Sequence, residues 1–142
     1  MIKLDISKAY DRVEWCFLEE VMTKLSFNER WIALMMICVK IVSYLVLVNG
    51  EPKALIHPTR GIHQGDPLSP FLFLLCTEGL NSLILKAESE GSIHGFALSR
   101  RSPKQTHLLF VDDSLLFYRS SRNKCQKVLD ILASYNSMLG KK

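Results

Sequence analysis

Two adjacent aspartates, Asp112 and Asp113, lie between two apolar runs in the segment HLLFVDDSLLF, residues 107–117. Each run has the length and composition of a β-strand, and charged groups are almost never fully buried unless they are paired. A two-residue hairpin turn would account for the pair by exposing both carboxylates to water. Alternatively, convergent carboxylates hold divalent cations for phosphoryl or nucleotidyl transfer, and the cations offset the repulsion between like charges.

A third aspartate lies at the end of an apolar segment near the start of the chain. Asp5 follows the short run that begins at Ile2, and it precedes a segment with helical spacing of apolar residues. If this strand neighbours the 107–117 hairpin in a sheet, three carboxylates meet at one place. The alternative is that Asp5 caps the following helix, which is a common role for aspartate.

Periodicity and turn signals predict a mixed order of strands and helices. Asn49-Gly50 is a strong hairpin signal, Asn28 and Asp66 are good N-caps, and Gly140 marks a helix end. The expected strands are 2–6, 43–48, 53–56, 94–99 and the two arms of 106–118, and the expected helices are 8–25, 29–41, 67–90 and 123–139. Because no strict βαβ repeat is present, we expect an α+β fold, an antiparallel sheet with helices packed on one face.

Composition limits the size and class of the protein. A chain of 142 residues with 48% hydrophobic content can bury one core and is too apolar for disorder. The net charge of +4 is mild, so it indicates a polyanionic partner only weakly. The cluster of Arg100, Arg101 and Lys104 is explained equally well by a solvated loop.

The cysteines and the apolar stretches bear on location. No cysteine has a second Cys or a His at ligand spacing, which predicts reduced thiols and neither a zinc site nor a disulfide framework. The apolar stretches 32–48 and 71–85 contain polar residues and fall short of the ~20 residues of a membrane span. Charge also comes too early for a secretory leader. We therefore expect an intracellular protein of the nucleus or cytoplasm, with no membrane partner.

Three segments resemble the successive A, B and C motifs of the reverse transcriptase palm. They are LDISKAYDRV at 4–13, RGIHQGDPLSP at 60–70 and HLLFVDD at 107–113. Their order and spacing match the family, and together they cover nearly the whole chain. The wording is most similar to that of non-LTR (LINE-type) retrotransposon reverse transcriptases, especially those of plants.

The resemblance implies a polymerase palm that acts as an RNA-directed DNA polymerase. Asp5, Asp112 and Asp113 would be the catalytic residues and would bind two Mg²⁺ ions, with Mn²⁺ as an alternative. One metal would activate the primer 3′-hydroxyl for attack on the α-phosphate, and the other would stabilise the leaving pyrophosphate. The implied partners are an RNA template with a DNA primer and deoxynucleotides.

The same resemblance assigns binding roles to four further residues. Tyr10 matches the steric gate that excludes a 2′-hydroxyl, although packing against the core would also explain an aromatic residue here. Gln64 and Gly65 match motif B residues that contact the incoming nucleotide and the template. Arg60 lies just ahead of them, where it would reach a phosphate or remain a solvated loop residue.

The sequence begins four residues before Asp5 and stops where the family's motif D begins. We therefore expect residues 1–142 to form a partial reverse transcriptase domain that lacks complete fingers and thumb. Two functions follow from this. The chain is either a polymerase domain or a catalytically inactive retrotransposon remnant that acts at most as a nucleic-acid or protein binding domain.

Overall fold

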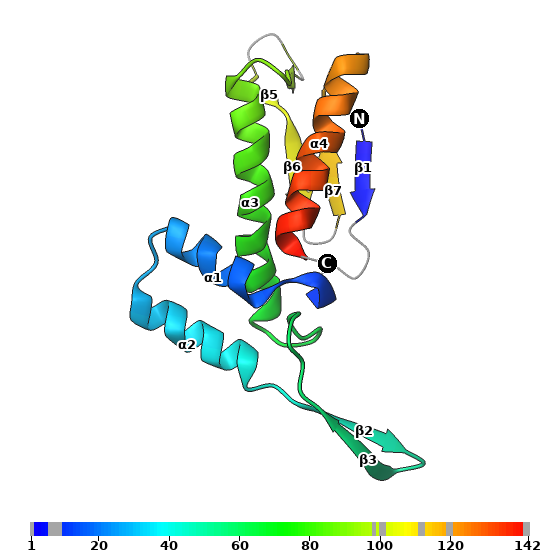
Figure 1. Ribbon diagram of the computed structural model, residues 1–142. Coiled ribbons are helices and arrows are strands. Elements are labelled where there is room, and N and C mark those ends of the chain that lie inside the picture. Colours follow the sequence, from blue (N-terminus) through cyan, green and yellow to red (C-terminus); the bar gives the residue numbers. More distant parts are fainter. Residues whose placement is uncertain are drawn as a thin grey trace.

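A computed structural model describes residues 2–5, 10–97, 99, 102–110, 113–118 and 121–140, and for residues 4, 5, 110 and 113 it describes the backbone alone. Helices and strands alternate irregularly along the chain (Figure 1). In chain order the described elements are β1 (Ile2–Asp5), the 3₁₀ helix η1 (Tyr10–Arg12), α1 (Trp15–Lys24), α2 (Glu29–Lys40), β2 (Tyr44–Val48), β3 (Glu51–Ile56), α3 (Ser69–Ser89), β4 (Phe96–Ala97), β5 (Lys104–Gln105), β6 (His107–Phe110), β7 (Asp113–Leu116) and α4 (Arg122–Leu139).

The sheet that organises the molecule has the strand order β1-β7-β6, and both pairings are antiparallel. Helices α3 and α4 lie across one face of it (Figure 1). Ser114 and Leu116 of β7 are buried on that face, whereas Leu108 of β6, whose register partner is Leu115, is 51% exposed. Since side chains alternate between the faces of a strand, the sheet has one covered and one open face. The predicted α+β fold with helices on one face is confirmed.

The core joins α1, α3 and α4 through close aromatic and backbone contacts. The ring of Phe17 meets that of Tyr135 edge to face, with centroids 6.3 Å apart. The hydroxyl of Tyr135 donates to the carbonyl oxygen of Cys76 at 3.3 Å. Gly79 allows this approach, because a Cβ there would lie 3.1 Å from the Phe17 ring. Burial raises the pKa of the Cys76 thiol to about 12, so this free cysteine stays protonated.

Helix α3 is long and apolar enough to cross a membrane by length and composition. It spans 21 residues and so exceeds the apolar stretch 71–85 that the sequence predicted. Its apolar side chains have another explanation, since Leu72, Phe73, Leu80 and Ile84 are buried in the core beneath α1 and α4. Core packing therefore accounts for these four side chains, whereas Phe71, Leu74 and Leu85 of the same helix are exposed.

The predicted helix over 8–25 is wrong at its start. Residues 10–12 form η1, and α1 begins only at Trp15. Tertiary hydrogen bonds explain the break. The carbonyl oxygen of Val13 accepts from the amide of Gly61 at 2.7 Å, and the amide of Glu14 donates to Leu139 at 2.9 Å. These two backbone groups are therefore not available to a continuous helix.

The start predicted for the third helix is also wrong, by two residues. The helix begins at Ser69 rather than Pro67. The carboxylate of Asp66 accepts from the amide of Leu68 at 2.8 Å, and the carbonyl of Asp66 accepts from the amide of Ser69 at 3.1 Å. Asp66 therefore caps a turn that precedes the helix.

The strand expected over 94–99 is shorter than predicted and is reduced to β4.

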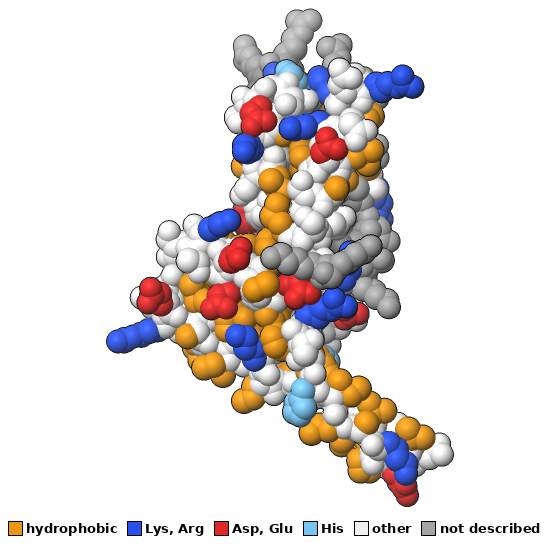
Figure 2. Space-filling model, in the orientation of Figure 1, with side chains coloured by type: hydrophobic (Ala, Val, Ile, Leu, Met, Phe, Trp, Pro, Cys, Tyr) orange, Lys and Arg blue, Asp and Glu red, His pale blue; other side chains and the backbone are white. Residues whose placement is uncertain are grey.

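The hairpin of β2 and β3 projects away from the body of the molecule (Figure 1). Asn49 and Gly50 both have positive φ, 51° and 80°, as a tight type I′ turn requires, so the predicted hairpin is confirmed. Figure 2 shows hydrophobic side chains along its length. Leu45, Leu47 and Leu55 are each exposed by more than half. Beyond Tyr44 at its base, the hairpin is thus an arm that carries exposed apolar side chains.

Acid is expected to weaken the fold through His107, the first residue of β6. Its ring nitrogen Nδ1 lies 2.9 Å from the hydroxyl of Thr106. Burial lowers the pKa of His107, and the charges of Glu88 and Glu78 oppose this only in part. As the pH falls below about 6.5, the unfolded chain binds a proton that the folded chain resists, so stability decreases. Chemical denaturation at pH 7.5 and 5.5 should show this loss, and His107→Gln should reduce it. His57 is exposed, so His57→Gln is the control and should keep the full loss. An unchanged difference in unfolding free energy between the two pH values in His107→Gln would contradict the assignment of the loss to His107.

Candidate active site

One end of the sheet brings together two of the three predicted catalytic positions. Asp5 is the last residue of β1 and Asp113 is the first of β7, and the two are direct register partners. Directly opposed residues in antiparallel strands have Cα atoms about 4.5–5.5 Å apart. Asp112, the residue before Asp113, lies outside the described residues. The prediction that the Asp5 strand neighbours the hairpin is confirmed, and Asp5 is the last residue of that strand.

The chemistry of these residues suits a hard divalent cation, because carboxylate oxygens are the ligands that Mg²⁺ prefers in proteins. Among the side chains that the structure describes, no group of three or more His, Cys, Asp or Glu residues gathers as a metal site would require. The side chains of Asp5, Asp112 and Asp113 are not among those described. The metal site thus remains a prediction, supported by the register of β1 and β7.

Tyr10 lies on η1, five residues beyond Asp5. Its ring stacks on Phe73 of α3, with centroids 5.1 Å apart and an angle of 22° between the planes. Phe73 is fully buried, so Tyr10 rests on a rigid part of the core. The two interpretations of Tyr10, as a steric gate and as a residue packed on the core, are therefore compatible. One face of its ring packs on Phe73, while the residue as a whole stays partly exposed.

Three hydrogen bonds join the end of motif A and the nearby Trp15 to the start of motif B. The amide of Ile62 donates to the carbonyl of Tyr10 at 3.0 Å, and the amide of Gly61 donates to Val13 at 2.7 Å. The indole Nε1 of Trp15 donates to the carbonyl of Gly61 at 2.8 Å. We call these five residues the A–B clamp. It holds Tyr10 and the motif B loop in one fixed relation.

Gly61 is the one position of the clamp that requires glycine. Its φ is +84°, and a Cβ would lie 3.2–3.3 Å from backbone atoms of Asp11 and Tyr10. Sequence reasoning missed both Gly61 and Trp15. A glycine near the start of motif B is typical of an ordinary turn. Trp15 fits one more apolar position of the predicted first helix. The sequence carries no signal that these two residues bond to each other.

Arg60 forms an ion pair with Glu14, at 3.6 Å between Nη1 and Oε1. The side chain of Glu14 is only 22% exposed. The Arg60 side chain is 57% exposed and a guanidinium has five donors, so most of its hydrogen-bonding capacity faces water. Arg60 is thus oriented by Glu14 and still accessible to a ligand.

Gln64 and Gly65 lie in an exposed turn between the clamp and α3. Gly65 has a φ of +96°, and apart from its chain neighbours no heavy atom of the described residues lies within 4 Å of the place where a Cβ would stand. The backbone is therefore open to the close approach of a ligand. Their predicted contacts with nucleotide and template stay predictions.

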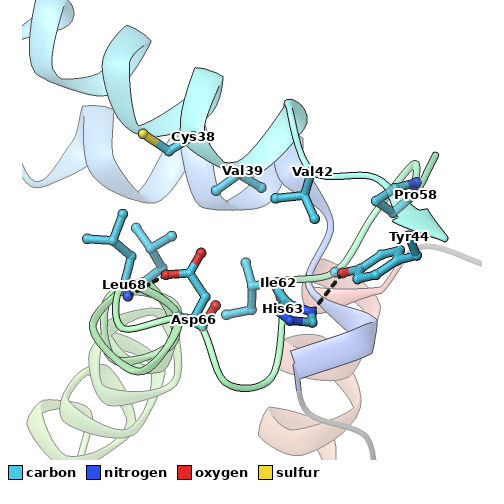
Figure 3. Close-up of a pocket in the computed structure, with 12 residues that line it drawn as sticks. Cys38, Val39, Val42, Tyr44, Pro58, Ile62, His63, Asp66 and Leu68 are labelled. Carbon is cyan, nitrogen blue, oxygen red and sulfur yellow. Dashed lines mark hydrogen bonds between the residues drawn. The ribbon is translucent and has the colours of Figure 1, made fainter. Parts of the chain in front are cut away.

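Tyr44 and His63 meet where the hairpin leaves the body (Figure 3). The Tyr44 hydroxyl lies 3.2 Å from Nδ1 of His63, and the ring centroids are 5.2 Å apart. Both residues line a small pocket under α2 and also a wider open groove, which Arg60 and Gln64 line as well. Sequence reasoning found no role for His63.

A profile of the family described as reverse transcriptase (RNA-dependent DNA polymerase) matches residues 1–140. The chain belongs to the reverse transcriptase family. The match contains all three motifs, so the predicted family and the enzyme class that goes with it are confirmed. An uncharacterized mitochondrial protein of Arabidopsis thaliana is 50% identical over 70 residues, which are 49% of this chain and 57% of that protein. The chain thus spans little more than half of that relative, which comes from a plant.

Proposed function

We propose that this reverse transcriptase domain adds deoxynucleotides to a primer 3′-hydroxyl on an RNA template, with Asp5, Asp112 and Asp113 as its metal-binding and catalytic residues. The observation that supports this most is the register of β1 and β7, which sets Asp5 opposite Asp113. The motif wording further favours a palm of the non-LTR retrotransposon type. We also propose an intracellular location, in the nucleus or the cytoplasm. The relative described as mitochondrial makes the mitochondrion a further candidate compartment.

Each residue of the site has a distinct part in this proposal. Two divalent cations, when bound, would activate the 3′-hydroxyl and stabilise charge on the leaving pyrophosphate. The three carboxylates would hold those cations near the primer end. Gln64 and Gly65 would orient the incoming nucleotide against the template. The A–B clamp would hold this loop at a fixed position relative to the metal-binding end of the sheet. Its hydrogen bonds join the loop to Tyr10 and Val13, which come after Asp5 in the chain.

Replacement of Tyr10 by alanine is expected to admit ribonucleotides, because the ring that would meet a 2′-hydroxyl is gone. Tyr10→Phe is the matched control, since it keeps the stacking on Phe73 and therefore the gate. Single-nucleotide incorporation with matched deoxy- and ribonucleotides measures the ratio. Unchanged sugar selectivity in Tyr10→Ala would contradict the role of Tyr10.

The proposal as a whole is tested by primer extension on an RNA template with Mg²⁺ and deoxynucleotides. Extension that is lost in the aspartate variants supports it. No extension by the unaltered chain, together with intact folding and RNA binding, would instead indicate a binding domain that is catalytically inactive.

A further inference from the structure

The open groove beside the hairpin is walled by three parts of the chain. Asp11 of η1 lies on one side, Tyr44 of β2 on another, and Arg60, His63 and Gln64 come from the loop ahead of α3. The groove therefore joins the end of motif A, the base of the hairpin and the motif B loop. Its walls carry two aromatic rings, a cation, a carboxylate and an amide.

The two rings form an aromatic surface, and because their planes are tilted by 44° a flat ligand stacks on one ring and not on both. Figure 3 shows Tyr44 and His63 directed at each other from separate segments, joined by their hydrogen bond. The bond fixes one ring against the other, so the surface is formed before any ligand arrives. His63 is exposed and Tyr44 is partly exposed. Unpaired bases of RNA are bound in this way, by stacking on aromatic side chains.

The polar groups of the groove match the other parts of a nucleotide. The carboxylate of Asp11 accepts hydrogen bonds, as the exocyclic amine of cytosine, adenine or guanine requires, whereas uracil presents a carbonyl at the corresponding position. Arg60, oriented by Glu14 and largely exposed, supplies donors for a phosphate. Base, amine and phosphate thus each find a chemical counterpart on the groove wall.

We propose that this groove binds one unpaired nucleotide of an RNA strand. Its base stacks on the ring of Tyr44, which is joined to His63 by a hydrogen bond, an exocyclic amine donates to Asp11, and Arg60 contacts the phosphate. The identification of this strand as the template rests on the proposed function. The binding itself requires neither metal nor catalysis.

Binding of a short fluorescent cytidylate RNA to the full chain, measured by anisotropy without Mg²⁺, tests the stacking surface. We expect Tyr44→Leu to weaken binding by roughly ten-fold or more. Tyr44→Phe, which keeps the ring, should lose less. The matched control is Phe27→Leu, because Phe27 forms another aromatic pair, with Trp31 at 4.5 Å, outside the groove. Equal losses in Tyr44→Leu and Phe27→Leu, or no loss in Tyr44→Leu, would overturn the proposal.

Comparison of cytidylate with uridylate RNA tests the base contact, because the two differ at the amine and not in ring size. The unaltered chain should prefer cytidylate, and Asp11→Asn should reduce that preference. Circular dichroism of each variant confirms that it is folded. A chain that binds RNA through Tyr44 but extends no primer would refute the proposed function and leave this inference standing. A chain that extends primers with no effect of Tyr44→Leu on RNA binding would do the reverse.

Discussion

Primer extension is expected to fall by at least roughly a thousand-fold when Asp112 or Asp113 is replaced by asparagine. Such a loss corresponds to about 4 kcal/mol of transition-state stabilisation, within the range that bound divalent cations supply. Asn keeps the size of the side chain and removes the charge that would hold a cation. Asp5→Asn should have a similar effect, because its backbone position lies opposite Asp113 in the sheet.

The matched control for these variants is Asp130→Asn. Asp130 is an exposed carboxylate on α4 that accepts from Gln126 at 3.0 Å and takes no part in the proposed site. Extension on an RNA template should therefore be unchanged in it. Full activity in Asp112→Asn would contradict the two-metal assignment. Loss of activity in Asp130→Asn as well would attribute the effect to folding rather than to catalysis.

Gly61→Ala is expected to destabilise the fold more than a glycine substitution that costs conformation alone. Any L residue with a φ near +84° is strained by about 1–2 kcal/mol. At Gly61 the new methyl group also meets backbone atoms of Asp11 and Tyr10, and overpacking of this kind adds about 1–3 kcal/mol. The end of motif A and the motif B loop should then move apart. The residues of the proposed site that they carry should separate as well.

Gly91→Ala separates the two costs, because Gly91 has a φ of +69° and nothing within 4 Å of its Cβ position. Urea denaturation of both variants gives the difference in unfolding free energy. Trp15→Phe removes the hydrogen bond to Gly61, which contributes about 0.5–1.5 kcal/mol, and also part of an indole ring that packs against the core. Equal stability of Gly61→Ala and Gly91→Ala would show that the close approach in the clamp is absent.

The elements predicted correctly are those whose signals lie within a few residues of them. Asn49-Gly50 produced the hairpin turn, and the side chain of Asn28 accepts from the amide of Arg30 at the start of α2, as a cap should. Gly140 follows the last helix at its expected end. In each case the residues that form the hydrogen bond or adopt the unusual φ are local, so the sequence pattern contains the cause.

The errors arise where a distant segment competes for the backbone. The helix expected over 8–25 is broken because Val13 and Glu14 bond to Gly61 and Leu139 instead of to their own neighbours. No window of sequence around Val13 contains those partners. The ion pair of Glu14 is likewise absent from any local pattern, because its partner Arg60 is remote in the chain.

By itself, the sequence determined the family, through three motifs in their proper order, and the local conformation of the hairpin and helices. Only the tertiary structure decided that Asp5 lies opposite Asp113, that Tyr10 rests on Phe73, and that Tyr44 meets His63. The physical reason is the range of the interactions. Caps and turns are set by neighbouring residues, whereas strand order and side-chain contacts depend on how the whole chain packs its one core.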